Sequence, residues 1–181
     1  MVPATPEPPF EVCDAARAGE RCLRSLAAFA EGDAITRFRA AIVRSAPSRA
    51  TLQVSETEHV ELSPAALLFV NHSCAPNVGF DVERWTLAAL RPIAPGDELT
   101  FFYPATEWAM DEPFACACRS PACLRRVAGA SQMSANELEG HRLAPHIVRL
   151  IDRDRRRRAA QEGPPAGSPR ERPCPPSSAR S

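Results

Sequence analysis

The chain has 181 residues, enough for one domain with a sizeable core, and its 22 basic and 22 acidic residues give a formal net charge of zero. A neutral chain has no overall attraction for nucleic acid or anionic lipid, and no apolar stretch approaches the ~20 residues that span a bilayer. All of the basic residues are arginine, so the protein has no lysine side chain of its own to modify.

The N-terminal segment, residues 1–9, carries four prolines and little apolar content. We expect it to be disordered, and the absence of a basic start and an apolar run predicts no signal peptide. The expected location is intracellular: cytoplasmic in a bacterium, or nuclear in a eukaryote. In such a reducing compartment the seven cysteines indicate metal ligands before disulfides.

Short apolar runs between turn residues dominate the middle of the chain and predict strands. Ser63-Pro64 predicts a helix N-cap followed by proline at the first helical position. Residues 65–70 should therefore form a short helix that delivers Asn71 and His72 at its end. The apolar runs lie at 34–35, 41–43, 51–54, 78–82, 85–90 and 99–103.

Two further helices are predicted near the C-terminus. Ser134 to Glu137 fits a capping box, and Pro145 opens a second helix through Ile151. From Arg153 the composition shifts to Arg, Pro, Ser, Gly and Ala, which predicts a disordered tail over 153–181. The basic run 153–158 could be a nucleic-acid or localisation patch, but a solvated tail is the preferred interpretation.

Three thiols, those of Cys116, Cys118 and Cys123, lie within eight residues and are separated by a turn. This spacing is typical of a zinc site, although reduced cysteines can also be small core residues. Structural zinc is almost always tetrahedral, so a fourth ligand must come from elsewhere in the chain.

Cys74 is the preferred fourth ligand, because it follows a helix end in a turn closed by Pro76. Four thiolates leave no open coordination position, so we predict one structural Zn²⁺ ion. The other candidate ligands are Cys13, Cys22, Cys174, His59, His72, His141 and His146.

Three motifs resemble those of the SET-domain family of protein-lysine methyltransferases, in particular its members with a cysteine-rich post-SET segment. They are Asn-His-Ser-Cys-Ala-Pro-Asn at 71–77, Glu-Leu-Thr-Phe-Phe-Tyr at 98–103, and the cysteine triplet. They follow the family's order, and the short linker from residue 104 is similar to that of a microbial subgroup.

The resemblance implies a mainly β fold in which the first two motifs thread past one another in a pseudoknot. It divides the chain into a SET domain at 10–112, a post-SET zinc segment at 113–130 and C-terminal helices at 131–152.

The activity implied by the resemblance is methylation of lysine side chains in a protein substrate, with S-adenosylmethionine as the methyl donor. Tyr103 is then the catalytic residue, while Phe101 and Phe38 line the substrate channel. The implied cofactor-binding residues are Asn71, His72, Tyr103, Arg21, Cys22, Phe114 and Val127, and the implied zinc ligands are Cys74, Cys116, Cys118 and Cys123.

The chemistry sets its own demands, because methyl transfer from a sulfonium to an amine is an in-line displacement that needs alignment and a neutral amine. Lysine in water has a pKa near ~10.4, and an apolar channel lowers that pKa by desolvating the cation. Phe101, Phe102 and Phe38 could wall such a channel, although Phe102 and Phe38 are equally compatible with core packing. Phenylalanine at 101, two residues before the tyrosine, implies room for a second or third methyl group.

The match fails at the family's glycine-x-glycine cofactor loop, which aligns with Glu20-Arg21-Cys22. Glycine permits close backbone approach to a ligand, so a side chain here could block the cofactor or require another backbone path. Arg119 and Arg125 likewise replace glycines that are common around the last cysteine.

These departures leave two alternatives to an active enzyme. One is a catalytically impaired, SET-like, zinc-stabilised protein-binding module, and the other is a small zinc module for nucleic acid, which the neutral charge disfavours. The expected partner is a protein that presents a lysine in a groove built from residues 39–60 and 106–111. We expect a monomer that associates with neither membrane nor nucleic acid.

Overall fold

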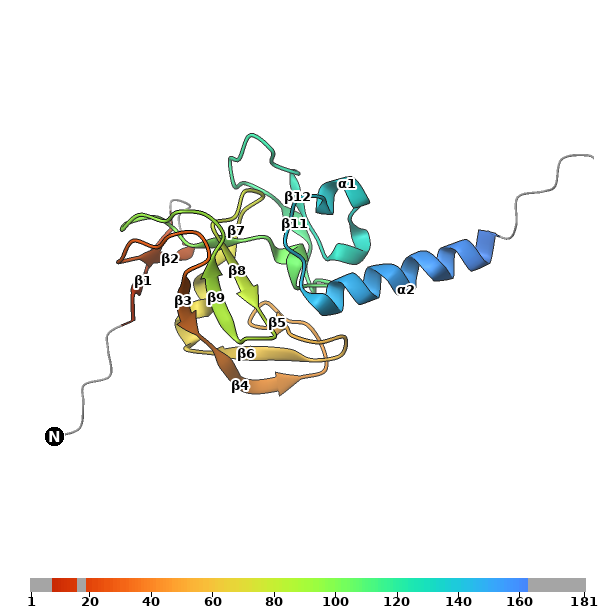
Figure 1. The fold of residues 1–181 in the computed structure, drawn as a ribbon, viewed down its shortest axis with the longest axis horizontal. Helices are drawn as coiled ribbons and strands as arrows, with labels where there is room; N and C mark the ends of the chain where they lie inside the picture. The colour runs from red at the N-terminus through yellow and green to blue at the C-terminus, as the bar shows by residue number, and fades with distance from the viewer. Residues whose placement is uncertain (1–7, 16–18, 163–181) are drawn as a thin grey trace, which may run out of the picture.

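The computed structural model describes residues 8–15 and 19–162, and it consists of short strands followed by helices near the C-terminal end (Figure 1). The mainly β architecture predicted from the sequence is confirmed. The predictions of disorder for residues 1–7 and 163–181 fall outside the described residues. None of the described helices is long and apolar enough to span a membrane.

The described strands form five small sheets, and two of these sheets pair strands that are distant in the sequence, β3 with β9 and β7 with β10. Two sheets have three antiparallel strands, in the orders β3-β9-β8 and β4-β6-β5. The pairs β1-β2 and β11-β12 are antiparallel, whereas β7 and β10 are parallel. The bounds are β1 Phe10–Asp14, β2 Arg21–Ser25, β3 Ala34–Arg37, β4 Arg39–Arg44, β5 Leu52–Gln53, β6 His59–Ser63, β7 Asn71–His72, β8 Val78–Asp81, β9 Thr86–Ala89, β10 Thr100–Phe101, β11 Phe114–Ala115 and β12 Arg126–Val127.

The helix predicted before the first motif is present, but it is a 3₁₀ helix, η1 (Ala65–Phe69), and Ser63 does not cap it. Ser63 is the last residue of β6 and lies opposite Arg39 in that sheet. Its backbone therefore belongs to the sheet, and Pro64 occupies the N-cap position after a cis peptide bond. The other 3₁₀ helices are η2 (Tyr103–Ala105) and η3 (Ala130–Gln132).

The capping box is confirmed at the start of α1 (Ala135–Leu138). Ser134 Oγ accepts a hydrogen bond from the Glu137 backbone N–H, and the Glu137 carboxylate accepts one from the Ser134 backbone N–H. This reciprocal pairing satisfies two backbone donors that a helix start otherwise leaves unpaired.

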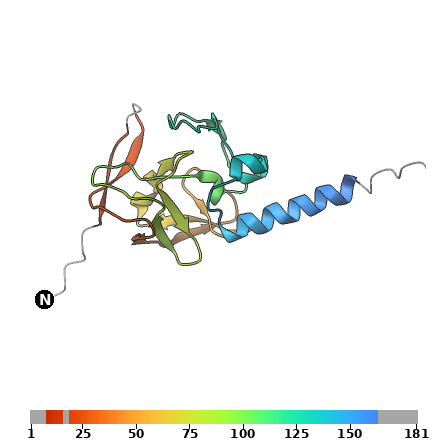
Figure 2. The same cartoon turned by 45° about the horizontal axis from the view of Figure 1, so that its top comes forward.

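Helix α2 (Pro145–Glu162) begins where predicted but continues far beyond Ile151. The prediction of disorder is therefore wrong for residues 153–162, because arginine and alanine are strong helix formers and prolong a helix whose first turns are already packed. Ile147 and Leu150 anchor those first turns in the core. The later turns project away from the body of the protein (Figures 1 and 2).

The chain crosses itself closely just after the cysteine-rich segment, at Gly129. A Cβ atom on Gly129 would lie 2.3 Å from the Trp108 carbonyl oxygen, so only glycine fits there. Adjacent hydrogen bonds run from Ala130 N–H to the Glu107 carbonyl at 2.8 Å and from Ser131 N–H to the Trp108 carbonyl at 3.0 Å. This contact between Gly129 and Trp108 fixes the end of the cysteine-rich segment against the residues that follow Tyr103.

Candidate active site and metal centre

The first two motifs lie side by side, because β7 and β10 form a parallel pair. Thr100 lies opposite Asn71, and Phe101 lies opposite His72. Parallel strands need a long crossover connection, which residues 73–99 supply. Because both strands run in the same direction, the residues that follow them emerge at the same end. This places Tyr103 beside the segment that carries Cys74.

Asn77, the last residue of the first motif, holds the two motifs together by hydrogen bonds. Its Nδ2 donates to the Glu98 carbonyl oxygen at 2.8 Å, and its Oδ1 accepts from the Thr100 backbone N–H at 2.8 Å. The Asn77 backbone N–H donates to the Thr100 carbonyl at 3.1 Å. Asn77 is buried, so losing these bonds would leave polar backbone groups unsatisfied away from water. The sequence analysis gave Asn77 no role of its own.

His72 lies between the tyrosine and a predicted metal ligand. Its Nδ1 accepts from the Tyr103 backbone N–H at 3.3 Å, and the two rings are 5.2 Å apart with an edge-to-face angle of 80°. Since Nδ1 is an acceptor, the neutral imidazole carries its proton on Nε2, which lies 3.3 Å from Cys74 Sγ. Burial, with a smaller contribution from His141, lowers the pKa of His72 to about 4, which keeps the ring neutral.

Tyr103 keeps its hydroxyl protonated. Burial raises the pKa of Tyr103 to about 12, and the carboxylates of Glu107, Glu20 and Glu98 act in the same direction. The hydroxyl makes one long hydrogen bond, 3.5 Å, to the Val70 carbonyl oxygen. Tyr103 is therefore available as a neutral hydrogen-bond donor and is not a phenolate base at physiological pH.

Asn71 and Arg21 meet on the other side of the crossing. Asn71 Nδ2 donates to the Arg21 carbonyl oxygen at 2.9 Å and to Glu98 Oε1 at 3.0 Å. The Arg21 guanidinium lies 4.6 Å from the centre of the Phe69 ring, a cation–π contact. The structure thus brings together Asn71, His72, Tyr103 and Arg21, four of the predicted cofactor-binding residues.

Cys22 belongs to a strand and not to a loop. It lies opposite Cys13 in the β1-β2 hairpin, is 2% exposed, and its thiol points to the Asp14 carbonyl at 3.5 Å. Burial and the neighbouring Cys13 raise the pKa of Cys22 to about 12, so the thiol is protonated. Its thiol is turned toward β1, and among the described residues it forms no hydrogen bond with Asn71, His72 or Tyr103.

Phe114 and Val127 lie opposite each other in the β11-β12 pair. Val127 is fully buried against Cys74 and Cys116. Phe114 is 43% exposed, and its ring centre lies 6.3 Å from that of Tyr103. An exposed aromatic face beside a partly buried tyrosine offers a stacking surface for a planar ligand.

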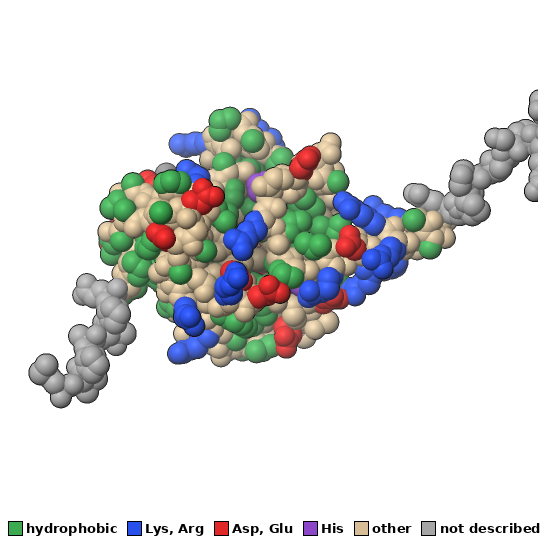
Figure 3. Space-filling model, viewed as in Figure 1, with side chains coloured by type: hydrophobic (Ala, Val, Ile, Leu, Met, Phe, Trp, Pro, Cys, Tyr) green, Lys and Arg blue, Asp and Glu red, His purple; other side chains and the backbone are tan. Residues whose placement is uncertain are grey.

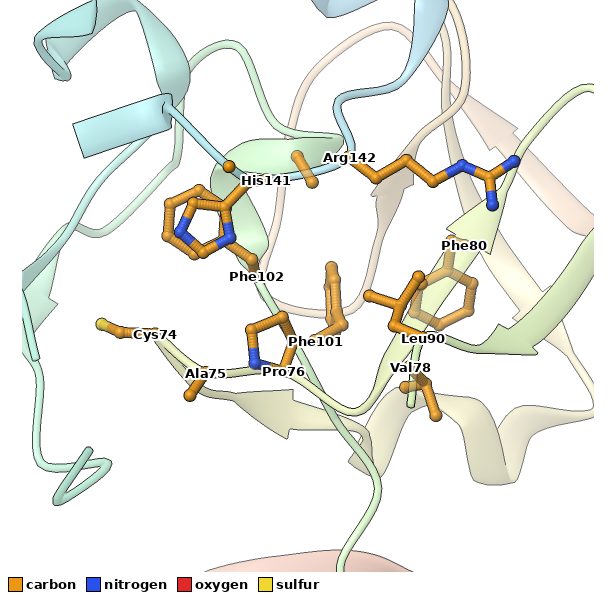
Figure 4. Close-up of a pocket in the computed structure, with 13 residues that line it drawn as sticks. Cys74, Ala75, Pro76, Val78, Phe80, Leu90, Phe101, Phe102, His141 and Arg142 are labelled. Carbon is orange, nitrogen blue, oxygen red and sulfur yellow. The ribbon is translucent and has the colours of Figure 1, made fainter. Parts of the chain in front are cut away.

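A cavity of about 440 Å³ opens beside Phe101, within the ~300–1,000 Å³ range of small-ligand clefts. The Phe101 ring lies 4.6 Å from that of Tyr103 and 4.8 Å from that of Phe80. Phe80 and Phe101 both line the cavity (Figure 4). Phe102 also borders the cavity and stacks in parallel on His141 at 3.6 Å. The lining residues are Cys74, Ala75, Pro76, Val78, Gly79, Phe80, Leu90, Phe101, Phe102, Ala105, Gly140, His141 and Arg142.

Phe38, the other predicted channel residue, does not line this cavity. Its ring packs against Phe80 at 5.4 Å and Trp85 at 5.3 Å, and the residue is buried in the core. Phe38 therefore supports the cavity wall through Phe80. The sequence analysis missed Phe80, whose signal was its position three residues after the first motif.

The four predicted zinc ligands come together. The Sγ atoms of Cys74, Cys116, Cys118 and Cys123 all lie within 4.8 Å of one another. The Cys74 and Cys116 sulfurs are 3.8 Å apart, and tetrahedral zinc with bonds near ~2.3 Å places its sulfurs about 3.8 Å from each other. The four thiols are therefore close enough to hold one tetrahedral zinc ion.

Hydrogen bonds around this cluster suit thiolates. The Leu124 N–H donates to Cys74 Sγ and the Arg125 N–H donates to Cys123 Sγ, both at 3.4 Å. Burial raises the pKa of Cys116. At Cys118 burial also acts upward, but backbone hydrogen bonds together with those from the Cys116 and Cys123 thiols outweigh it and lower the pKa to about 6. Four thiols this close cannot all ionise alone, and a divalent cation would remove that conflict.

Two arginines turn the chain around the knuckle in a conformation that favours glycine. Arg119 has φ 58° and Arg125 has φ 63°. The left-handed conformation costs a non-glycine residue roughly 1–2 kcal/mol, which metal binding can offset. The sequence analysis noted both positions as replaced glycines, and the backbone there keeps the glycine-like conformation.

A buried polar cluster lies behind the tyrosine and was not predicted. Glu107 Oε1 accepts from the Gln53 backbone N–H at 2.8 Å, while His146 Nε2 lies 2.8 Å from the Thr106 carbonyl. Glu107 Oε2 is 3.8 Å from His59 Nδ1. Burial raises the pKa of Glu107 to about 7 and lowers the pKa of His59, so this contact is not a stable ion pair at neutral pH.

Comparisons with known proteins agree with this geometry. Residues 20–104 match the model of the SET domain. The protein named methyltransferase flvH, from Aspergillus flavus, is 38% identical over 130 residues, which cover 71% of this chain and 72% of that protein. Histone-lysine N-methyltransferase ash1 from Drosophila melanogaster is 36% identical over 72 residues, 35% of this chain but only 3% of that protein.

The fold also has a solved counterpart. The crystal structure of KRYPTONITE in complex with mCHG DNA and SAH aligns with a TM-score of 0.51 and 23% identity, over 65% of this chain and 28% of the other. At that identity the likeness concerns the fold alone.

We predict that the purified protein carries close to one zinc ion per chain and that Cys118→Ser loses it, because three thiolates cannot complete the tetrahedral site. Metal content by atomic emission checks this directly. Cys13→Ser removes a thiol outside the cluster and should keep the zinc. Equal metal content in both variants would rule out the proposed ligand set.

We predict that Glu107→Gln stabilises the protein at pH 8 by on the order of 3 kcal/mol but not at pH 4.5. The pKa of Glu107 is raised from 4.5 to about 7 by folding, so its stability cost grows as pH rises between these values and is complete above them. Glutamine stays neutral and can still accept a hydrogen bond from the Gln53 N–H. Urea unfolding at both pH values measures the difference. Glu83→Gln, an exposed control, should show no such pH dependence, and a pH-independent effect at Glu107 would contradict its raised pKa.

Proposed function

The chain belongs to the SET-domain family, and on this premise we propose that it is an S-adenosylmethionine-dependent protein-lysine N-methyltransferase. The observation that carries the proposal is one juxtaposition around Tyr103. Its ring packs beside that of His72, the residue after Asn71, and beside the exposed Phe114 and the cavity-lining Phe101. A methyl donor and an acceptor amine need such adjacent sites, one polar and one apolar.

When bound, S-adenosylmethionine supplies a methyl group on a positively charged sulfonium. The side chain of Asn71 is held through its Nδ2, and no described residue donates a hydrogen bond to its Oδ1. That oxygen is therefore available to accept from the amino group of the donor. Glu98, fixed beside Asn71, adds a negative charge that favours a cationic ligand.

The acceptor amine has to lose its proton before it can attack. The acidic groups near Tyr103 oppose that loss, because they favour a cation. Desolvation by Phe101 and Phe80 therefore has to dominate, since an apolar wall lowers the pKa of a lysine amine. The protonated Tyr103 hydroxyl orients the reacting groups and takes no proton itself.

The missing glycines do not by themselves close the cofactor site. Glycine would let the backbone approach a ligand, and here the backbone of Arg21 already lies within hydrogen-bond distance of Asn71. The Cys22 side chain points into the hairpin and the Arg21 guanidinium stacks on Phe69, so each side chain has a place of its own.

A second candidate function is a SET-like protein-binding module without turnover, stabilised by the zinc knuckle. It is favoured by the replacement of the glycine loop with strand β2, in which Arg21 lies opposite Asp14. The two functions differ in one measurable property, which is binding of the methyl donor.

We predict that the wild type binds S-adenosylmethionine in calorimetry and that Asn71→Ala weakens binding at least tenfold, because it removes the polar contacts at Arg21 and Glu98. Asn136→Ala, on the exposed surface of α1, is the matched control. Tyr103→Phe should retain binding but lose transfer of labelled methyl groups to histones or other lysine-containing proteins. The enzyme has no lysine, so label on lysine comes only from a substrate. If the wild type does not bind S-adenosylmethionine, the proposal that the protein is a methyltransferase is refuted.

We predict that the wild type adds two or three methyl groups to its substrate lysine and that Phe101→Tyr limits the product to one. A phenolic hydroxyl at position 101 would occupy space in the cavity and hold a water or amine by hydrogen bonding. Mass spectrometry of the methylated substrate distinguishes the products. Monomethyl product from the wild type would contradict the role of Phe101.

A further inference from the structure

The two halves of helix α2 have different surroundings. His146, Ile147 and Leu150 are buried, so the first turns belong to the core. From Asp152 to Gln161 the helix is exposed apart from partly buried Asp154. Figures 1 and 2 both show this part projecting away from the strands. No hydrophobic contact explains why the helix continues so far.

The projecting half of α2 has a net positive charge, and the rest of the chain has a net negative charge. Residues 152–161 contain five arginines against Asp152 and Asp154, a net charge of +3, so the rest of the neutral chain carries −3 (Figure 3). Because the chain is neutral in total, no nucleic-acid partner was expected. The total nevertheless combines two regions of opposite net charge. The helix seen here makes this separation, which a disordered tail would not hold in one place.

Ion pairs with the protein satisfy only part of this charge. Glu56 pairs with Arg149 at 3.3 Å and Arg153 at 2.6 Å, and Asp154 pairs with Arg158 at 2.7 Å. No described residue forms an ion pair with the remaining arginines, which are Arg155, Arg156 and Arg157.

Like charges also repeat along one face of the helix. Arg149, Arg153 and Arg157 follow one another at intervals of four residues, a spacing at which like charges repel. With Arg156 they border a shallow hollow on the helix surface. A bound polyanion would convert this repulsion into attraction.

Arginines surround the projecting half on all sides. Successive helical residues are rotated by roughly 100°, so the four consecutive arginines at 155–158 point in four different directions. A flat acidic surface can meet only one of those directions. The major groove of duplex DNA, about 12 Å wide, admits a helix and has phosphates along both walls.

We propose that the projecting half of α2 binds duplex nucleic acid by lying in a groove, with its arginines on the phosphates of both strands. The guanidinium group matches phosphate oxygens in bidentate geometry, which favours this partner for a helix whose basic residues are all arginine. Ten helical residues span about 15 Å, the length of roughly four base pairs. Recognition would therefore rest on the backbone and be largely independent of base sequence.

The test is fluorescence anisotropy of a labelled 20-base-pair DNA duplex with the full chain at increasing salt. We expect micromolar binding at low salt and a log–log salt slope near about −3, which corresponds to three or four phosphates neutralised. Replacing Arg155, Arg156 and Arg157 together by glutamine should weaken binding at least tenfold and flatten the slope. Glutamine keeps helix propensity, and circular dichroism verifies that α2 remains.

A matched triple variant distinguishes binding at this site from a general effect of the protein's net charge. Arg37, Arg39 and Arg91 are exposed on the body of the protein, and their replacement by glutamine changes net charge equally. This control should bind as the wild type does. Absence of binding at low salt, equal loss in both triple variants, or tighter binding to polyglutamate than to the duplex would overturn the proposal. The proposal does not depend on methyl transfer, which is assayed separately.

Discussion

The parallel contact between β7 and β10 is the constraint on which the rest of the site depends. Only two residue pairs form it, Asn71 with Thr100 and Phe101 with His72, so it gains little from its own ladder. Asn77 supplies what the short ladder lacks, because its amide bonds the second segment on both sides of Leu99. Fixing β7 beside β10 therefore positions both the polar residues Asn71 and His72 and the apolar residue Phe101.

The cysteine cluster extends this constraint to the C-terminal part of the chain. Cys74 leaves the crossing directly, while the other three thiols arrive from a segment more than forty residues later. A metal there would join the two segments and would hold β11-β12, including Phe114, beside Tyr103. His72 contacts both Cys74 and Tyr103, so the metal centre and the tyrosine share one packing unit. After this segment, the backbone of Gly129 packs directly against the backbone of Trp108.

Sequence reasoning identified the motifs because their chemistry is local, and it placed the four thiols correctly because three of them are neighbours in the chain. It missed strands such as β1, β2 and β6, whose alternation is broken by charged residues and whose partners are remote. Ser63 failed as a cap because pairing in β6 overrode its local preference. Glu107, His59 and His146 carried no local signal, since only the folded chain buries them together.

Electrostatic demands on the two sides of Tyr103 are opposite, and the fold separates them. In the proposed reaction the donor is cationic and would be favoured by Glu98, which is held near Asn71. The acceptor amine must be neutral and would need the apolar wall of Phe101. A charged tyrosine would disturb both sides, by attracting the ammonium and by holding its proton in place. Burial that raises the pKa of Tyr103 to about 12 prevents this. The acidic groups around the tyrosine help to keep its hydroxyl protonated and would favour a cationic donor. They would also favour a charged amine, so desolvation by the apolar wall of Phe101 has to outweigh them.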